Sequence, residues 1–234
     1  FVDAIACEDT RRTGLLLSKF DIKKKLISYH EHNRSQKSPI LISMLESGMN
    51  LALVSDAGMP CISDPGEELV RDCSLKNLPI QVIPGPVAGI SALALSGLDS
   101  KRFFFEGFIP SEGKERKERL QELVYHRNTF ILYEAPHKLV RTLRDLRETL
   151  GNRRMTLCRE LTKKHETAFH STIDDLITHY EKEKPLGECV LVIEGKSRQE
   201  LKEEAVASWE EISIEEHMEI YEKQGMSRKY AMKQ

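Results

Sequence analysis

Short apolar stretches rich in β-branched and aromatic residues recur along the chain, between segments whose apolar residues repeat at helical spacing. The pattern predicts strands at residues 26–29, 51–55, 80–83, 103–108, 129–133, 155–159 and 189–194. It predicts helices at residues 66–73, 88–98, 115–126 and 137–150. Because strands that alternate with helices favour a largely parallel sheet with crossover connections, we expect an α/β fold.

Composition shifts divide this pattern into three parts. A turn-rich segment at residues 108–113 is followed by a highly charged helical stretch, and charged, helix-favouring sequence follows Gly195. We therefore expect an N-terminal α/β lobe at residues 1–108, a second α/β lobe at 109–198 and a helical tail at 199–234. The whole chain has 234 residues, which is enough to bury a sizeable core without disulfides.

Cysteine usage and hydropathy indicate where such a protein works. The five cysteines are scattered and include no CxxC pair, which is typical of a reducing compartment. No apolar run reaches the length of a membrane span, and we expect a cytoplasmic protein with no membrane partner.

The formal net charge of −2 hides an uneven distribution. Residues 199–223 hold nine Glu against two Lys, so the rest of the chain is mildly basic. Basic clusters lie at residues 11–12, 23–25, 114–119, 153–154 and 163–164. Most such clusters are solvated surface charge, but a local basic patch also suits phosphate binding.

Two turn-rich segments follow predicted strands and carry the strongest functional signal. The first runs from Ser55 to Gly66 and holds two Gly, two Pro and two Asp besides small polar residues; the second runs from Pro84 to Gly89. Ligands bind beyond the carboxyl ends of parallel strands, and glycine permits a close approach of ligand to backbone. The segments therefore predict one small-molecule pocket, although an ordinary strand-to-helix turn remains the alternative for each. Neither matches a phosphate-binding glycine loop.

Other polar residues also follow predicted strands. The stretch at residues 30–33 has two His at strand spacing, but no third ligand is evident, so we expect a polar loop and no metal site. Titratable residues also gather at residues 7–13, 134–138 and 160–166. Each group alone suits capping or surface charge, whereas the three together favour a functional edge.

Eight motifs carry a family resemblance. They are CEDTRRT, SYHEHN, LVSDAGMPCISDPG, VIPGPVAGISALALSG, FEGFIP, YEAPHK, RELTKKHE and GECVLVIEG. In order and spacing over residues 3–196, the chain resembles the ribosomal RNA small-subunit methyltransferase I family, bacterial cytidine 2′-O-methyltransferases of the tetrapyrrole methylase superfamily. The resemblance implies a two-lobed α/β fold with a mostly parallel N-terminal sheet and a mixed second sheet. It also implies a homodimer that binds S-adenosylmethionine and small-subunit ribosomal RNA.

Carried over by position, the resemblance implies a cofactor site. Its residues are Ser55, Asp56, Ala57, Gly58, Pro60, Asp64, Pro84, Val87, Ala88, Tyr133 and Glu134. The family's first strand and its loop lie upstream of Phe1, and the final residues resemble the start of a longer helical extension, so we expect a longer natural protein.

A ribose hydroxyl needs a base or a strong acceptor before it attacks a methyl sulfonium. The candidates are Asp9, Glu134, His137, Lys163 and His165, and we expect Glu134 and Lys163 to act, Lys163 through a depressed pKa. We expect Arg11, Arg12 and Lys163 to contact RNA. The alternatives are a methylase of tetrapyrroles or protein side chains, and a ribosome-binding protein that has lost its cofactor.

Overall fold

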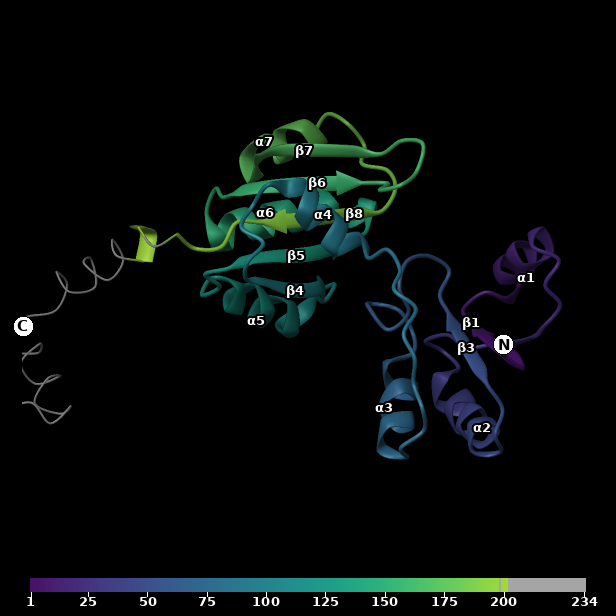
Figure 1. The fold of residues 1–234 in the computed structure, drawn as a ribbon. Coiled ribbons are helices and arrows are strands. Elements are labelled where there is room, and N and C mark those ends of the chain that lie inside the picture. Colours follow the sequence, from purple (N-terminus) through teal and green to yellow (C-terminus); the bar gives the residue numbers. More distant parts are fainter. Residues whose placement is uncertain (198, 202–234) are drawn as a thin grey trace, which may run out of the picture.

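The computed structural model describes residues 1–197 and 199–201. Figure 1 shows two α/β lobes joined by extended segments, with the purple to blue N-terminal elements in one lobe and the blue-teal to yellow-green elements in the other. The predicted α/β fold, with one parallel and one mixed sheet, is confirmed. Most of the predicted tail, at residues 202–234, lies outside the described residues.

The N-terminal lobe is built on a three-stranded sheet in the order β2-β1-β3. Its strands are β1 (Ala4–Cys7), β2 (Lys25–Ser28) and β3 (Leu51–Val54), and both pairings are parallel. The helices are α1 (Thr10–Lys19), α2 (Arg34–Glu46) and α3 (Glu67–Leu75). Residues of α2 and α3 pack on Ala6 and Tyr29 in a small core, whereas α1 contacts β2. Because both strand pairings are parallel, the carboxyl ends of all three strands lie at one edge of the sheet.

The second lobe holds a five-stranded mixed sheet in the order β4-β5-β8-β6-β7. The strands are β4 (Phe103–Phe108), β5 (Thr129–Glu134), β6 (Arg154–Arg159), β7 (Thr167–Thr172) and β8 (Cys189–Ile193). Only β4 and β5 pair in parallel; the other neighbours are antiparallel. The helices are α4 (Ala88–Ser96), α5 (Gly113–Leu123), the short 3₁₀ helix η1 (Pro136–Lys138), α6 (Leu139–Leu150) and α7 (Ile173–Tyr180).

Strand alternation divides the residues of this second sheet between two helical layers. Phe130 and Leu132 of β5 face the core formed with α5, α6 and α7. Ile131 lies on the opposite face, where it packs with Ala92 and Leu93 of α4. Successive side chains of a strand point to opposite faces, so each position along β5 is committed to one layer. The face on which a strand residue lies therefore determines whether its side chain can reach the site.

Two sequence-based expectations are corrected by this arrangement. Residues 80–83 form no strand, although Ile80 and Val82 have a strand-like pattern, because no strand within residues 1–197 and 199–201 pairs with this segment. The expected lobe boundary after Phe108 does not match the division between the sheets either. Strand β4 pairs with β5, and α4 packs on the same sheet, so both belong structurally to the second lobe.

The predicted ranges do not include five elements: β1 and α1, which flank the titratable residues at 7–13, and α2, β7 and α7. Helix α2 contains Pro39, which obscures the helical pattern, and β7 and α7 follow one another with little turn sequence between them. The other predicted strands and helices are present, with boundaries shifted by a few residues. None of the helices in the described residues is long and apolar enough to cross a membrane.

Candidate functional site

The two turn-rich segments lie against each other, as the sequence predicted. A β-carbon added at Gly58 would lie 3.6 Å from the carbonyl oxygen of Pro86, and one at Gly85 would lie 3.9 Å from Met59 Sδ. Gly58 has φ +75°, a left-handed conformation that glycine adopts without strain. Cys61 and Ser63 in the same segment also have positive φ, which costs energy for residues with a β-carbon. The first segment is thus held in a specific, partly strained conformation beside the second.

Tyr133 connects the second segment to the sheet of the second lobe. Its hydroxyl accepts a 2.9 Å hydrogen bond from the backbone N–H of Gly89, the second residue of α4. A β-carbon at Gly89 would lie 3.2 Å from both Tyr133 Oη and Phe105 Cε2, so any larger residue would have to displace these side chains by a few tenths of an ångström. Burial is the main cause that raises the pKa of Tyr133. The predicted site residue Tyr133 therefore lies beside Val87 and Ala88.

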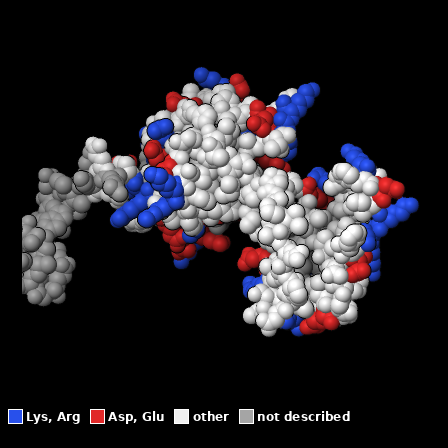
Figure 2. All heavy atoms as spheres, in the orientation of Figure 1, with Lys and Arg blue, Asp and Glu red and all other residues white. Residues whose placement is uncertain are grey.

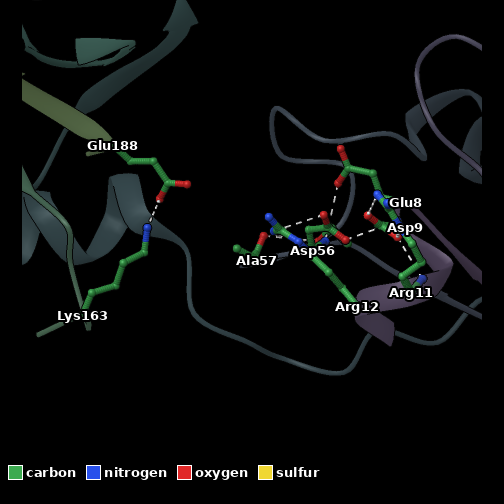
Figure 3. A network of polar contacts seen from close by, with 9 residues as sticks. Glu8, Asp9, Arg11, Arg12, Asp56, Ala57, Lys163 and Glu188 are labelled. Atoms are coloured by element: carbon green, nitrogen blue, oxygen red, sulfur yellow. Dashed lines mark hydrogen bonds and ion pairs between the residues drawn. The ribbon is translucent and has the colours of Figure 1, made fainter. Parts of the chain in front are cut away.

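A charged network joins the ends of β1 and β3 in the N-terminal lobe. Asp56 Oδ1 accepts a 3.2 Å hydrogen bond from the backbone N–H of Asp9, and Asp56 Oδ2 lies 3.2 Å from Arg12 Nη1. The backbone N–H of Asp56 donates to Glu8 Oε2 at 3.5 Å. Figure 3 shows Glu8, Asp9 and Asp56 gathered on one side of the site. Adjacent parallel strands place these residues together because their carboxyl ends share one edge.

Asp9 and Arg11 form a tight pair within this network. Two hydrogen bonds run from the Arg11 guanidinium to the Asp9 carboxylate at 3.0 and 2.7 Å, and a third runs from the Arg11 backbone N–H at 2.8 Å. These bonds lower the pKa of Asp9 well below its usual value. A carboxylate that holds its proton so weakly is a poor general base. Asp9 therefore acts as the N-cap of α1, with its side chain ionised.

Asp64 has the opposite electrostatic environment. Burial first, and then the negative charge of Glu8, raise the pKa of Asp64 from 3.8 to about 6, while a hydrogen bond from Ser55 acts in the other direction. The charges of Asp56 and Glu188 also contribute to the increase. The site thus concentrates carboxylates from both lobes around Asp64. Such a cluster favours a bound positive charge.

Lys163 lies on the second-lobe side of the site, where Figure 3 shows it with Glu188 facing the network of the N-terminal lobe. Its ammonium is 3.1 Å from Glu160 Oε1 and 3.1 Å from Glu188 Oε2. The hydrogen bonds to Glu188 and Glu160 raise the pKa of Lys163. The expectation of a depressed pKa is therefore wrong, because two carboxylates stabilise the protonated amine.

Glu134 points away from the site, into the core between the sheet and α6. It is only 6% exposed, and its Oε2 accepts a 2.5 Å hydrogen bond from Thr142 while its Oε1 accepts from the Ala135 N–H at 2.8 Å. Strand alternation places the side chains of Glu134 and Tyr133 on opposite faces of β5. The expectation that Glu134 contacts the cofactor or a substrate hydroxyl does not fit this geometry.

The Glu134 carboxylate belongs to a buried network centred on Arg116, which is 3% exposed. Arg116 donates to Thr142 Oγ1 at 3.0 Å, to the carbonyl of Pro110 at 2.9 Å and to Asp145 Oδ2 at 2.6 and 2.9 Å. The network thus ties the chain after β4 to α5, α6 and the end of β5. It fixes the two strand ends that carry Phe108 and Tyr133.

The remaining candidates are scattered around these groups. His137 and His165 are exposed, and no described contact connects either with the site. Asn33 Nδ2 lies 3.2 Å from His30 Nε2, and Asn33 Oδ1 accepts from the His30 backbone N–H, so residues 30–33 form the expected polar turn. Within residues 1–197 and 199–201, no three His, Cys, Asp or Glu side chains are placed to hold a metal ion.

Known proteins are similar to this chain in both sequence and fold. A family model described as Tetrapyrrole (Corrin/Porphyrin) Methylases matches residues 2–177. The chain belongs to the tetrapyrrole methylase family. It is 43% identical over 232 residues, 99% of this chain and 79% of the relative, to the Ribosomal RNA small subunit methyltransferase I of Bacillus subtilis. It is 44% identical over 234 residues, 100% of this chain and 82% of the relative, to the protein of the same name from Synechocystis. The resemblance inferred from the motifs is confirmed.

Two solved structures show the same architecture at low sequence identity. A cobalt precorrin-4 methyltransferase matches with a TM-score of 0.57 and 14% identity, covering 82% of this chain and 83% of that chain. A diphthine synthase matches with a TM-score of 0.59 and 14% identity, covering 82% and 80%. At this identity the likeness establishes the fold alone.

Two members of the described polar networks were missed as functional candidates from the sequence. Glu188 precedes β8 within the GECVLVIEG motif, and its place opposite Lys163 follows from the antiparallel pairing of β8 with β6. Arg116 was counted among the basic residues of a surface helix, yet it is buried. Its spacing from Leu120 and Leu123 placed it on the apolar face of α5, which was the available signal.

Proposed function

We propose that the chain methylates the 2′ hydroxyl of a cytidine ribose in small-subunit ribosomal RNA, with S-adenosylmethionine as donor. The observation that carries this proposal is the 43–44% identity, over at least 99% of the chain, to proteins named Ribosomal RNA small subunit methyltransferase I. The ribose and cytidine specificity rests on the motif resemblance. The low-identity structural neighbours favour no second substrate.

We propose that the cofactor binds where residues 55–66 meet residues 84–89. The exposed backbone at Ala57 and Gly58, the prolines at 60 and 84, and Val87 and Ala88 supply a shaped wall. Ser55, Asp56 and Asp64 supply polar groups, and Tyr133 closes the second-lobe side. When bound, S-adenosylmethionine supplies an electrophilic methyl group on a positively charged sulfonium. The carboxylates around Asp64 fit this charge.

The chain's own residues then have three tasks. The pocket walls hold the donor and the ribose in line, which lowers the entropic part of the barrier. Lys163, held protonated by Glu160 and Glu188, contacts an RNA phosphate or ribose oxygen, and Arg11 and Arg12 hold the strand on the opposite side. Glu134 positions the end of β5 through Thr142 and does not take the proton.

The decisive experiment incubates the full-length protein with labelled S-adenosylmethionine and unmodified small ribosomal subunits, and then maps the label. We expect one labelled cytidine ribose. Label on a base, or no label on RNA, would overturn the proposal. A thermal shift with S-adenosylmethionine separates an enzyme from a ribosome-binding protein without cofactor, because only a binder is stabilised.

A matched pair of glycine variants locates the cofactor. Gly58 and Gly97 both have positive φ, +75° and +67°, so Gly58→Ala and Gly97→Ala impose similar backbone strain. No atom lies within 4 Å of a β-carbon at Gly97, whereas Gly58 lies against Pro86. We expect only Gly58→Ala to weaken cofactor binding measured by calorimetry. Equal effects would remove the 55–66 segment from the proposed site.

We propose a homodimer as the working unit, on the motif resemblance alone. Sedimentation of the full-length protein measures this directly. A monomer at all concentrations at which methylation is observed would contradict the proposal.

A further inference from the structure

Basic residues of this chain differ in how far carboxylates neutralise them. Arg11 and Arg12 pair with Asp9 and Asp56, and Lys163 pairs with Glu160 and Glu188. On α5, Lys114 pairs with Glu118, Arg116 with Asp145, and Arg119 with Glu106 and Glu122. Most of the basic clusters seen in the sequence are therefore compensated locally. For these clusters, the number of basic residues overstates the net positive charge that an anionic partner meets.

The corner between α1 and β2 differs from these clusters. Lys19, Lys23, Lys24 and Lys25 are exposed, and none of them forms an ion pair with any residue in the part of the chain that the structure describes. Asp21 is the single acidic residue among residues 19–25. Four uncompensated cations within seven residues create a local positive potential despite the net charge of −2. Figure 2 shows blue atoms around this end of the N-terminal lobe.

Large apolar side chains lie exposed among these lysines. Phe20 is 68% exposed and Ile22 is 44% exposed. The backbone that presents them is fixed, because the N–H groups of Phe20 and Ile22 both donate to the carbonyl of Leu17 at 3.0 Å. An aromatic ring on a fixed backbone has only two side-chain torsions to order when a planar group stacks on it, which keeps the entropic cost of stacking small.

We propose that this corner, residues 19–25, binds a single-stranded segment of the ribosomal RNA substrate. The lysines contact phosphates and the Phe20 ring stacks on a base. Cations that follow the backbone, combined with an exposed aromatic side chain, are the features of sites for single-stranded nucleic acid. The inference rests on the proposed function, since it assigns a further contact surface to the same substrate.

The position of the corner relative to the site supports this assignment. Helix α1 begins beside the Asp9 and Asp56 network, with exposed Arg11 and Arg12, and ends at Lys19. Ten helical residues span about 15 Å. An RNA strand that enters the site past the two arginines therefore reaches the corner by following α1, whose Leu15 and Leu16 are also exposed.

The test compares two changes at the corner with matched changes on the second lobe. The corner variants are Lys23→Ala/Lys24→Ala/Lys25→Ala and Phe20→Ala. The controls are Lys114→Ala/Lys117→Ala/Lys182→Ala, which removes the same charge from exposed positions, and Tyr125→Ala, which removes an exposed aromatic ring. Binding of the full-length proteins to unmodified small subunits is measured over a series of salt concentrations, with cofactor binding measured separately by calorimetry.

We expect the triple corner variant to bind more weakly and to reduce the slope of log affinity against log salt by about 2, the value for three phosphate contacts to single-stranded RNA. We expect Phe20→Ala to weaken binding about tenfold with the slope unchanged, because stacking releases no counterions. The controls should bind as the unmodified protein does. Cofactor affinity should be the same for all five proteins.

Three results would overturn the proposal. Corner variants that bind like their controls would show that RNA does not contact this surface. A corner variant that changes the sedimentation coefficient but not subunit binding would identify the surface as an interface between copies of the chain. Equal losses in corner and control variants would indicate nonspecific charge effects. None of these outcomes affects ribose labelling by the unmodified protein, so the proposed function is judged independently.

Discussion

The two lobes use polar residues at strand ends in opposite ways. In the N-terminal lobe, Glu8, Asp9 and Asp56 form a partly exposed, acid-rich network at the ends of β1 and β3. In the second lobe, Glu134 at the end of β5 is buried with Thr142 and Arg116. The first network leaves charged groups accessible to a ligand, whereas the groups of the second form their hydrogen bonds with one another. Position at a strand end therefore does not by itself make a residue part of the site; the face of the sheet decides.

The largest expected effect comes from breaking the buried network. Arg116→Ala removes the partner of Asp145 and leaves Thr142 and the Pro110 carbonyl without a donor, so we expect a loss of about 3 kcal/mol in the free energy of unfolding. Denaturant unfolding measures this. The control is Arg141→Ala, which is exposed and 4.0 Å from the same carboxylate, and should cost under about 0.5 kcal/mol. Equal losses in the free energy of unfolding for the two variants would show that the buried network stabilises the protein no more than an exposed ion pair does.

Glu134→Gln distinguishes a positioning role from a catalytic one. Glutamine keeps an acceptor but weakens the bonds to Thr142 and Ala135, so we expect a loss of about 1 to 2 kcal/mol in stability. Methyl transfer should fall by much less than the roughly 10²- to 10⁴-fold of a missing general base, with the shape of its pH profile unchanged. A stable variant with a hundredfold lower kcat would restore Glu134 as the base.

Asp64→Asn tests the acidic site of the N-terminal lobe, where we expect the substitution to increase the stability of the protein. The pKa of about 6 for Asp64 in the folded protein lies above its usual 3.8, so ionisation destabilises the folded state as pH rises from about 4 to 6, and the cost persists above that. We expect the variant to be more stable at pH 7 by about 1 kcal/mol after solvent screening.

The same substitution should weaken cofactor binding, because the ionised carboxylate complements the sulfonium. In the unmodified protein, affinity should fall as pH decreases through about 6, and this dependence should be absent from Asp64→Asn. Calorimetric titration at several pH values measures it. An identical pH dependence in both proteins would contradict the assignment of Asp64 to the cofactor site.

Apart from the Arg141 control, the smallest expected change in stability is at Lys163. Because the side chain is half-exposed between Glu160 and Glu188, we expect Lys163→Gln to cost less than about 1 kcal/mol in stability while weakening subunit binding. Lys163→Arg keeps the cation and should restore binding and activity. If Lys163 were instead a general base, the arginine variant would be inactive, because arginine does not lose its proton. Inactivity of Lys163→Arg would therefore refute the cationic role.

Much of the site was predictable from the sequence because its signals are local. Glycines and prolines such as those at residues 55–66 and 84–89 favour turns through their own backbone preferences; Gly58 has a positive φ, and Gly89 lies in close contact with Tyr133 and Phe105. Short apolar stretches likewise predicted seven strands, of which six are present. The exception, at residues 80–83, has the composition of a strand but lacks a neighbour.

The sequence by itself determined the α/β class, the turn-rich segments and the family, since these depend on periodicity, backbone preference and motif order. Only the tertiary structure decided which charges are used within the fold and which remain available. Arg116 and Glu134 looked like surface and site residues but are buried together, whereas Lys163 gained two carboxylates that raise its pKa. Burial and pairing depend on residues distant in the chain, and electrostatic energies change steeply with both, so no local pattern specifies them.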